Sequence, residues 1–110
     1  MITIEKLNEF GADTAEGLAR CFGNEALYLQ LVNMLPGEKS FAALEQATAD
    51  GDLTAAFEAA HALKGVTGNL SLTPLYEKAS ALTELLRAKK DADYAALTAE
   101  IIDLKNQLCG

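Results

Sequence analysis

The 110-residue sequence has no tryptophan, one histidine, and only two cysteines and two prolines. Basic residues are also few, because nine lysines and arginines stand against sixteen aspartates and glutamates and leave a net charge of −7. A protein that binds nucleic acid needs a positive surface to displace counterions, and the longest basic cluster here is "RAKK" at residues 87–90. The composition therefore predicts that nucleic acid is not a partner.

Long hydrophobic runs and a leader segment are missing as well. No apolar run approaches the roughly 18 residues of a membrane span, and the first ten residues lack the basic start and apolar region of a secretory signal. Cys21 and Cys109 lie near opposite ends of the sequence, so one bridge between them is possible. Two cysteines without a secretory signal more often remain reduced thiols. We expect a soluble cytoplasmic protein with no membrane insertion.

The residues that are abundant favour helices. Half of the sequence is hydrophobic, and alanine and leucine dominate while β-branched residues are sparse. A chain of this length supports one core. We therefore predict a single domain over residues 1–110.

Three short helices are expected before the Pro36-Gly37 break, at residues 3–10, 14–22 and 24–35. The first would end at Gly11, and the second would follow Asp13 and stop at Gly23. In the third, which begins at the potential cap Asn24, Leu27, Leu31 and Leu35 recur every four residues.

Four longer amphipathic helices are expected after the break, at about residues 38–50, 53–70, 73–90 and 91–108. Asp52 can cap the second of them, Thr73 followed by Pro74 is the preferred order at the start of the third, and Asp91 or Asp93 can cap the fourth. Short connections favour antiparallel neighbours. The prediction is an all-α fold, an antiparallel up-down four-helix bundle (about 38–108) with short N-terminal helices (about 3–35) packed over it.

The single histidine, His61, lies within the second long helix. On a helical wheel of about 100° per residue, Phe57, Lys64, Gly65 and Gly68 fall within about 60° of His61. The opposite face is apolar and is the expected core stripe: Ala56, Ala59, Leu63 and Leu70. His61 is therefore predicted to point outward.

The two glycines beside His61 suggest a purpose for this face. Each costs roughly 1 kcal/mol relative to alanine in a helix interior, and each removes a side chain that would flank the imidazole. Neutral imidazole is a competent covalent nucleophile, and Lys64 can place a cation beside whatever the ring carries. The combination predicts a phosphoryl-accepting site.

Each residue of this set also has an ordinary explanation when taken alone. A lone surface histidine or lysine usually has no special role. Phe57 could pack against an N-terminal helix as readily as it could contact a partner, and Glu58 could orient the imidazole but is more often simply solvated. The prediction rests on the combination.

"AHALKG" at residues 60–65, with "GNL" at 68–70, closely resembles the motif of histidine-containing phosphotransfer (HPt) domains, the helical carriers of multistep phosphorelays. The resemblance covers roughly residues 15–90 and includes "CFGNEALYLQLVNML" before the bundle. It implies that His61 is phosphorylated, that Lys64 supports the phosphoryl group and that Gly65 leaves room for a receiver domain. Val66 and Ser71 depart from the residues that are commoner there.

The resemblance implies a carrier that is not an autonomous kinase. His61 would accept a phosphoryl group from the aspartate of a response-regulator receiver and pass it to another, within a relay fed by a hybrid sensor kinase. Phe57, Gly65 and Gly68 would contact the receiver, which would supply Mg²⁺. The sequence has no Walker-type loop or acidic metal-binding spacing, so we expect no ATP site, metal or cofactor of its own. We also expect a monomer.

Two alternatives have different chemistry. The first is a bundle that binds and regulates receiver or kinase domains without carrying phosphate, although such a binder has no need of His61 and Lys64. The second is a metal or haem bundle, for which one histidine and two distant cysteines supply too few ligands. A haem would also require His61 to face the interior.

Overall fold

The computed structural model describes all residues from 1 to 110 and is entirely helical, as predicted, with seven α-helices, one 3₁₀ turn and no strand. In chain order these are α1 (Ile4–Phe10), α2 (Thr14–Arg20), α3 (Glu25–Val32), the 3₁₀ turn η1 (Leu35–Gly37), α4 (Ser40–Asp50), α5 (Leu53–Asn69), α6 (Thr73–Arg87) and α7 (Tyr94–Cys109). The molecule is elongated and measures 41 × 24 × 20 Å.

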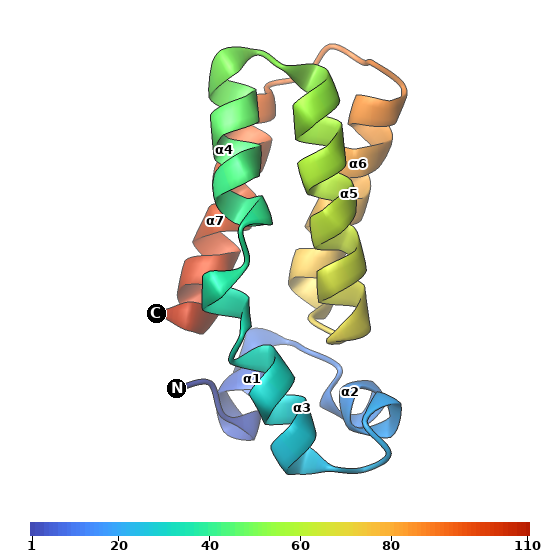
Figure 1. Cartoon of the computed structure of the whole chain (residues 1–110), viewed down its shortest axis with the longest axis vertical. Coiled ribbons are helices and arrows are strands. Elements are labelled where there is room, and N and C mark those ends of the chain that lie inside the picture. The colour runs from blue at the N-terminus through green and yellow to red at the C-terminus, as the bar shows by residue number, and fades with distance from the viewer.

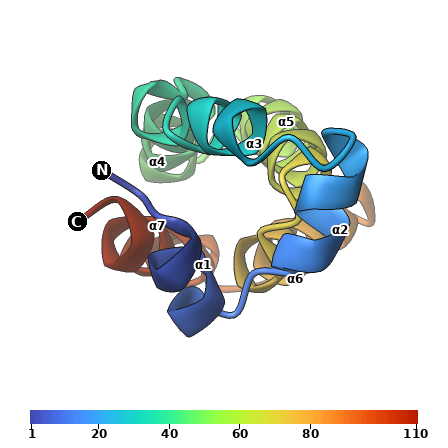
Figure 2. The same cartoon turned by 90° about the horizontal axis from the view of Figure 1, so that it is seen from below.

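The four longest helices lie side by side along the long axis of the molecule (Figure 1). α4 packs on α5, α5 on α6 and α6 on α7, and α7 returns to contact α4, so that the four form a closed ring seen from the end (Figure 2). Short connections join successive helices, the shortest being Gly51-Asp52 between α4 and α5. α5 therefore packs between α4 and α6, and its remaining face points away from the core.

Local signals in the sequence set most of the helix boundaries. Gly51 ends α4 in the left-handed conformation (φ 70°), where glycine has no steric penalty. The Asp52 carboxylate accepts a hydrogen bond from the Ala55 N–H at 3.0 Å, and Asp93, not Asp91, caps α7 in the same way. The start of α6 differs from the prediction. Thr73 is already the first helical residue, and no side chain caps this end.

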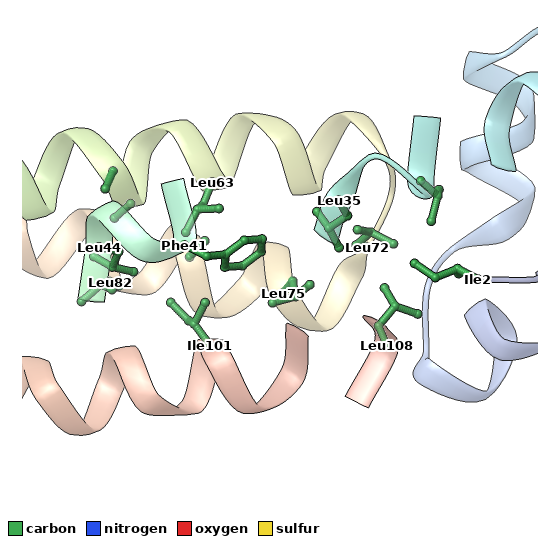
Figure 3. Packing of buried hydrophobic residues seen from close by; sticks show 14 of the residues in the cluster. Ile2, Leu35, Phe41, Leu44, Leu63, Leu72, Leu75, Leu82, Ile101 and Leu108 are labelled. Carbon is green, nitrogen blue, oxygen red and sulfur yellow. The ribbon is translucent and has the colours of Figure 1, made fainter. Parts of the chain in front are cut away.

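The core runs along the ring as one cluster of 20 buried hydrophobic residues, with Leu44 and Leu82 towards one end and Leu108 and Ile2 towards the other (Figure 3). The buried face of α5 consists of Ala56, Ala59, Ala60, Leu63 and Thr67. Leu70, the last residue of the predicted stripe, follows the end of α5 at Asn69 and is half-buried against the core. Thr67 is accommodated because its hydroxyl donates to the Leu63 carbonyl at 2.7 Å.

The three N-terminal helices close one end of the ring (Figures 1 and 2). The four-residue leucine spacing of α3 does not mark its buried face, because Leu27 and Leu31 are exposed while Tyr28 and Val32 are buried. The Asn33 side-chain oxygen accepts a hydrogen bond from the Ile2 N–H at 2.8 Å and ties this segment to the chain start. Polar contacts therefore help to fix these short helices.

Both cysteines are free thiols; Cys21 is buried and Cys109 is half-buried. Burial raises the pKa of the Cys109 thiol, although Lys105 and Lys6 act in the opposite direction. None of the helices is long and apolar enough to span a membrane.

Candidate functional site around His61

His61 lies on the outer face of α5 and is exposed, as the wheel predicts. Its neighbours Ala60 and Leu63 are fully buried, so the inner and outer faces of the helix are sharply separated. Neither imidazole nitrogen makes a hydrogen bond, and the Glu58 side chain, about one turn earlier, is exposed and forms no hydrogen bond with the imidazole. The nitrogens of His61 are therefore open to a reacting group.

Phe57 occupies the turn before His61 and stacks on it, with ring centroids 5.8 Å apart and planes inclined by 16°. The guanidinium of Arg87, the last residue of α6, also lies over the Phe57 ring, 5.1 Å from its centroid. Packing of Phe57 against an N-terminal helix, one of its two expected roles, was thus wrong: its neighbours are His61 and α6. The stack restricts the orientations open to the imidazole.

The two glycines have different surroundings. A Cβ at Gly65 would meet nothing within 4 Å, so the space beside the imidazole is open there. A Cβ at Gly68 would lie 3.1 Å from the Tyr76 ring of α6. Gly68 therefore allows close packing of Tyr76, an explanation that the wheel had disfavoured because Gly68 lies away from the core stripe.

A hollow of about 470 Å³ lies against this face of α5. His61, Lys64, Gly65 and Gly68, all singled out by the sequence motif, line it together. Phe57 does not; it borders a second hollow of about 550 Å³ between the start of α5 and the end of α6, with Leu53 and Leu86. The structure thus divides the predicted site residues between two adjoining depressions.

Sequence reasoning missed the other side of the first hollow, which comes from α2, from the turn between α5 and α6 and from the start of α6. Its side chains are Glu16, Arg20, Ser71 and Tyr76. No periodicity or motif connects α2 with His61, since more than 40 positions separate them. The only available signal was Ser71, which departs from the HPt pattern and has φ 56° here.

Specific hydrogen bonds hold α2 in this position. The buried Ser71 hydroxyl donates to Glu16 Oε1 at 2.8 Å, and the Asp13 N–H donates to the Ser71 carbonyl at 2.9 Å. Arg20 Nε donates to the same Glu16 oxygen at 3.4 Å. Glu16 therefore joins the turn after α5 to the one arginine of the hollow.

Tyr28 of α3 fixes the same turn from inside. Its hydroxyl donates to the Leu70 carbonyl at 2.8 Å, and its ring lies against Gly17 of α2, where any Cβ would overlap it. Burial, with smaller effects from Cys21, Asp13 and Glu16, raises the pKa of Tyr28 to about 12. The hydroxyl therefore stays protonated and remains a donor at neutral pH.

No three histidine, cysteine, aspartate or glutamate side chains come together as a potential metal site. Lys64 and Arg20 are the cations of the first hollow and Glu16 is its only carboxylate. The exposed imidazole thus shares a hollow with two positive side chains, which suits the binding of an anionic group next to it.

Comparison with protein-family models identifies an Hpt domain at residues 37–109, which is more than half of the chain. The chain therefore belongs to the Hpt domain family, whose members take part in histidine phosphotransfer in phosphorelays and interact with receiver domains. The matched segment contains α4–α7 and His61, and it leaves out the N-terminal helices that the resemblance had partly included. Searches of the curated proteins and of the solved structures found no match.

Proposed function

We propose that this protein is a phosphocarrier in which His61 accepts a phosphoryl group from a receiver-domain aspartate and passes it to a second receiver. The observation that carries the proposal is the exposure of the only histidine at the edge of a hollow that Lys64 and Arg20 also line. Its scaffold is an antiparallel up-down four-helix bundle, α4–α7, within a single domain that includes the N-terminal helices.

The reaction needs little from this chain beyond position and charge. A neutral imidazole nitrogen of His61 attacks the phosphorus in line, the N–P bond forms, and the bond from phosphorus to the aspartate oxygen breaks and releases the carboxylate. Lys64 would stabilise the negative charge on the phosphoryl oxygens as a point charge. Transfer to the second receiver is the reverse of these steps. Mg²⁺ belongs to the receiver in this scheme, and the chain uses no cofactor or ATP of its own.

Receiver binding would use the surface on both sides of His61. Gly65 leaves open space beside the imidazole, and Gly68 allows the Tyr76 side chain to pack closely against α5. Phe57 and Leu53 supply apolar surface at the second hollow, which the buried Leu86 also lines. The protein would work as a cytoplasmic monomer that relays phosphate from the receiver of a hybrid sensor kinase.

The test is acceptance of labelled phosphate from a panel of phosphorylated receivers with Mg²⁺, by the wild type and by His61→Gln. Acid-labile, base-stable label on the wild type alone is the expected result. Label on both proteins would contradict the assignment of His61. Receivers that bind but leave no label would instead favour the alternative, a bundle that regulates receivers or kinases without being phosphorylated.

A further inference from the structure

We propose that Arg20, on α2, binds the phosphoryl group carried by His61, and that Ser71 and Glu16 hold Arg20 in place for this purpose. The inference rests on the proposed phosphorylation of His61 and adds a second cation to its site. Lys64 comes with the motif on α5 itself, whereas Arg20 comes from a helix outside the matched segment, residues 37–109.

The first argument is that α2 is fixed relative to His61. Two hydrogen bonds join α2 to Ser71, in the turn after α5. The Ser71 carbonyl accepts one from the Asp13 N–H (2.9 Å), and the Ser71 hydroxyl donates the other to Glu16 (2.8 Å). The Tyr28 hydroxyl holds the preceding residue, Leu70, at 2.8 Å. These contacts connect α2 to the same helix that carries His61, so that Arg20 has a defined place on the wall of the hollow.

The second argument concerns the free donors of Arg20. Only Nε is used, in the 3.4 Å contact with Glu16, and the terminal guanidinium nitrogens make no hydrogen bond. Those nitrogens form the planar fork that matches two phosphate oxygens. The Glu16 carboxylate thus steadies one edge of the guanidinium and leaves the other edge available to an anion.

The third argument is the charge of the hollow. A phosphoryl group brings nearly two negative charges to a chain whose net charge is already −7, and Glu16 is a further negative charge in the same hollow. Lys64 alone would leave this charge unbalanced. Arg20 offsets the charge of Glu16, so that the charge of Lys64 remains for the phosphoryl group, and the free edge of the guanidinium supplies further hydrogen-bond donors. A mere i,i+4 ion pair on an exposed helix would contribute little to stability and would not need the buried Ser71 contact.

The experiment uses phosphoramidate, a small phosphodonor, so that no receiver is required. The phosphoramidate N–P bond breaks, phosphorus bonds to an imidazole nitrogen of His61, and ammonia leaves with the imidazole proton. The phosphorylated wild type, Arg20→Gln and Arg20→Lys are then titrated by ³¹P NMR. Lys78→Gln is the matched control, because Lys78 is a half-exposed cation paired with Glu100 outside the hollow.

A nearby cation favours the doubly charged phosphoryl group, so its removal should raise the midpoint of the ³¹P titration. We expect a rise of about half a pH unit in Arg20→Gln, most of which Arg20→Lys restores, and no change in Lys78→Gln. Thermal unfolding of the unphosphorylated Arg20 variants should match the wild type. A wild-type midpoint in Arg20→Gln, an equal rise in Lys78→Gln, or failure of phosphoramidate to label His61 would overturn the inference.

The titration tests the role of Arg20 separately from the proposed phosphocarrier function. If receivers transfer phosphate to His61 but the Arg20→Gln midpoint is unchanged, the phosphocarrier stands and Arg20 is only a helix-surface residue. If receivers do not transfer but the midpoint rises as expected, the phosphate-binding site stands and the relay does not.

Discussion

The N-terminal helices and the four long helices are held in place by different forces. α4–α7 have 11 to 17 residues each and bury continuous apolar faces, so that burial of leucine and alanine fixes them. α1–α3 have only seven or eight residues each, which is too short for independent stability. Long-range hydrogen bonds from Asn33, Tyr28 and Ser71 position them. The bundle carries the histidine, and the polar contacts of the N-terminal helices complete its surroundings.

The largest expected effect comes from the apolar core of the long helices. Leu63 is fully buried two residues after the exposed His61. Leu63→Ala should reduce the free energy of unfolding by about 2–5 kcal/mol through lost burial and a residual cavity. Denaturant unfolding measures it, with His61→Gln as the control that should leave stability unchanged. Equal losses in the two variants would contradict the placement of His61 outside the core.

A smaller effect is expected where the N-terminal helices pack. Gly17→Ala would force a Cβ against the Tyr28 ring and should cost about 1–3 kcal/mol through overpacking. Gly65→Ala, which also replaces a helical glycine but in open space, should instead stabilise the protein by about 0.5–1 kcal/mol. The two thermal unfolding midpoints should therefore move in opposite directions. A shift of both in the same direction would mean that α2 does not pack on Tyr28 as described.

A third stability effect concerns the Tyr28 hydroxyl. Its pKa is raised from 10.0 to about 12 in the folded protein, so the folded state holds this proton more tightly than the unfolded state does. The resulting stabilisation is fully present below about pH 10 and is lost as the pH rises towards 12.

Removal of that hydroxyl provides the measurement. Tyr28→Phe should lose about 0.5–1.5 kcal/mol at neutral pH, because the hydrogen bond to Leu70 disappears, and should show a weaker alkaline loss of stability than the wild type. Tyr76→Phe, at an exposed tyrosine, is the control. The same alkaline profile in the wild type and Tyr28→Phe would show that Tyr28 does not cause the loss.

The same difference between regions explains which features could be predicted from the sequence. Asp52, Gly51 and Asp93 act through neighbours within a few residues, so helix ends at these positions could be predicted. The outward position of His61 follows from helical periodicity alone. At α6 the local signal was misleading, because Thr73 is a favourable capping residue, yet the helix begins at Thr73 itself with Leu72 at the N-cap position and no side-chain cap.

Contacts between distant segments could not be predicted in this way. The buried face of α3, with Tyr28 and Val32, does not follow its leucine spacing, because Tyr28 and Asn33 orient this short helix through hydrogen bonds to Leu70 and Ile2. Arg20 has no sequence pattern that relates it to His61. The neighbours of Phe57 likewise depend on how the end of α6 meets the start of α5. Such features follow from tertiary packing and not from local periodicity.

The most direct test of the central claim is a relay between two receivers. A receiver charged with labelled phosphate is separated from excess label and mixed with the protein, and a second, unlabelled receiver is then added with Mg²⁺. We predict that label appears on the wild-type protein and then on the second receiver, and that neither step occurs with His61→Gln. Equal transfer to the second receiver with His61→Gln, or without the protein, would contradict a phosphocarrier role for His61.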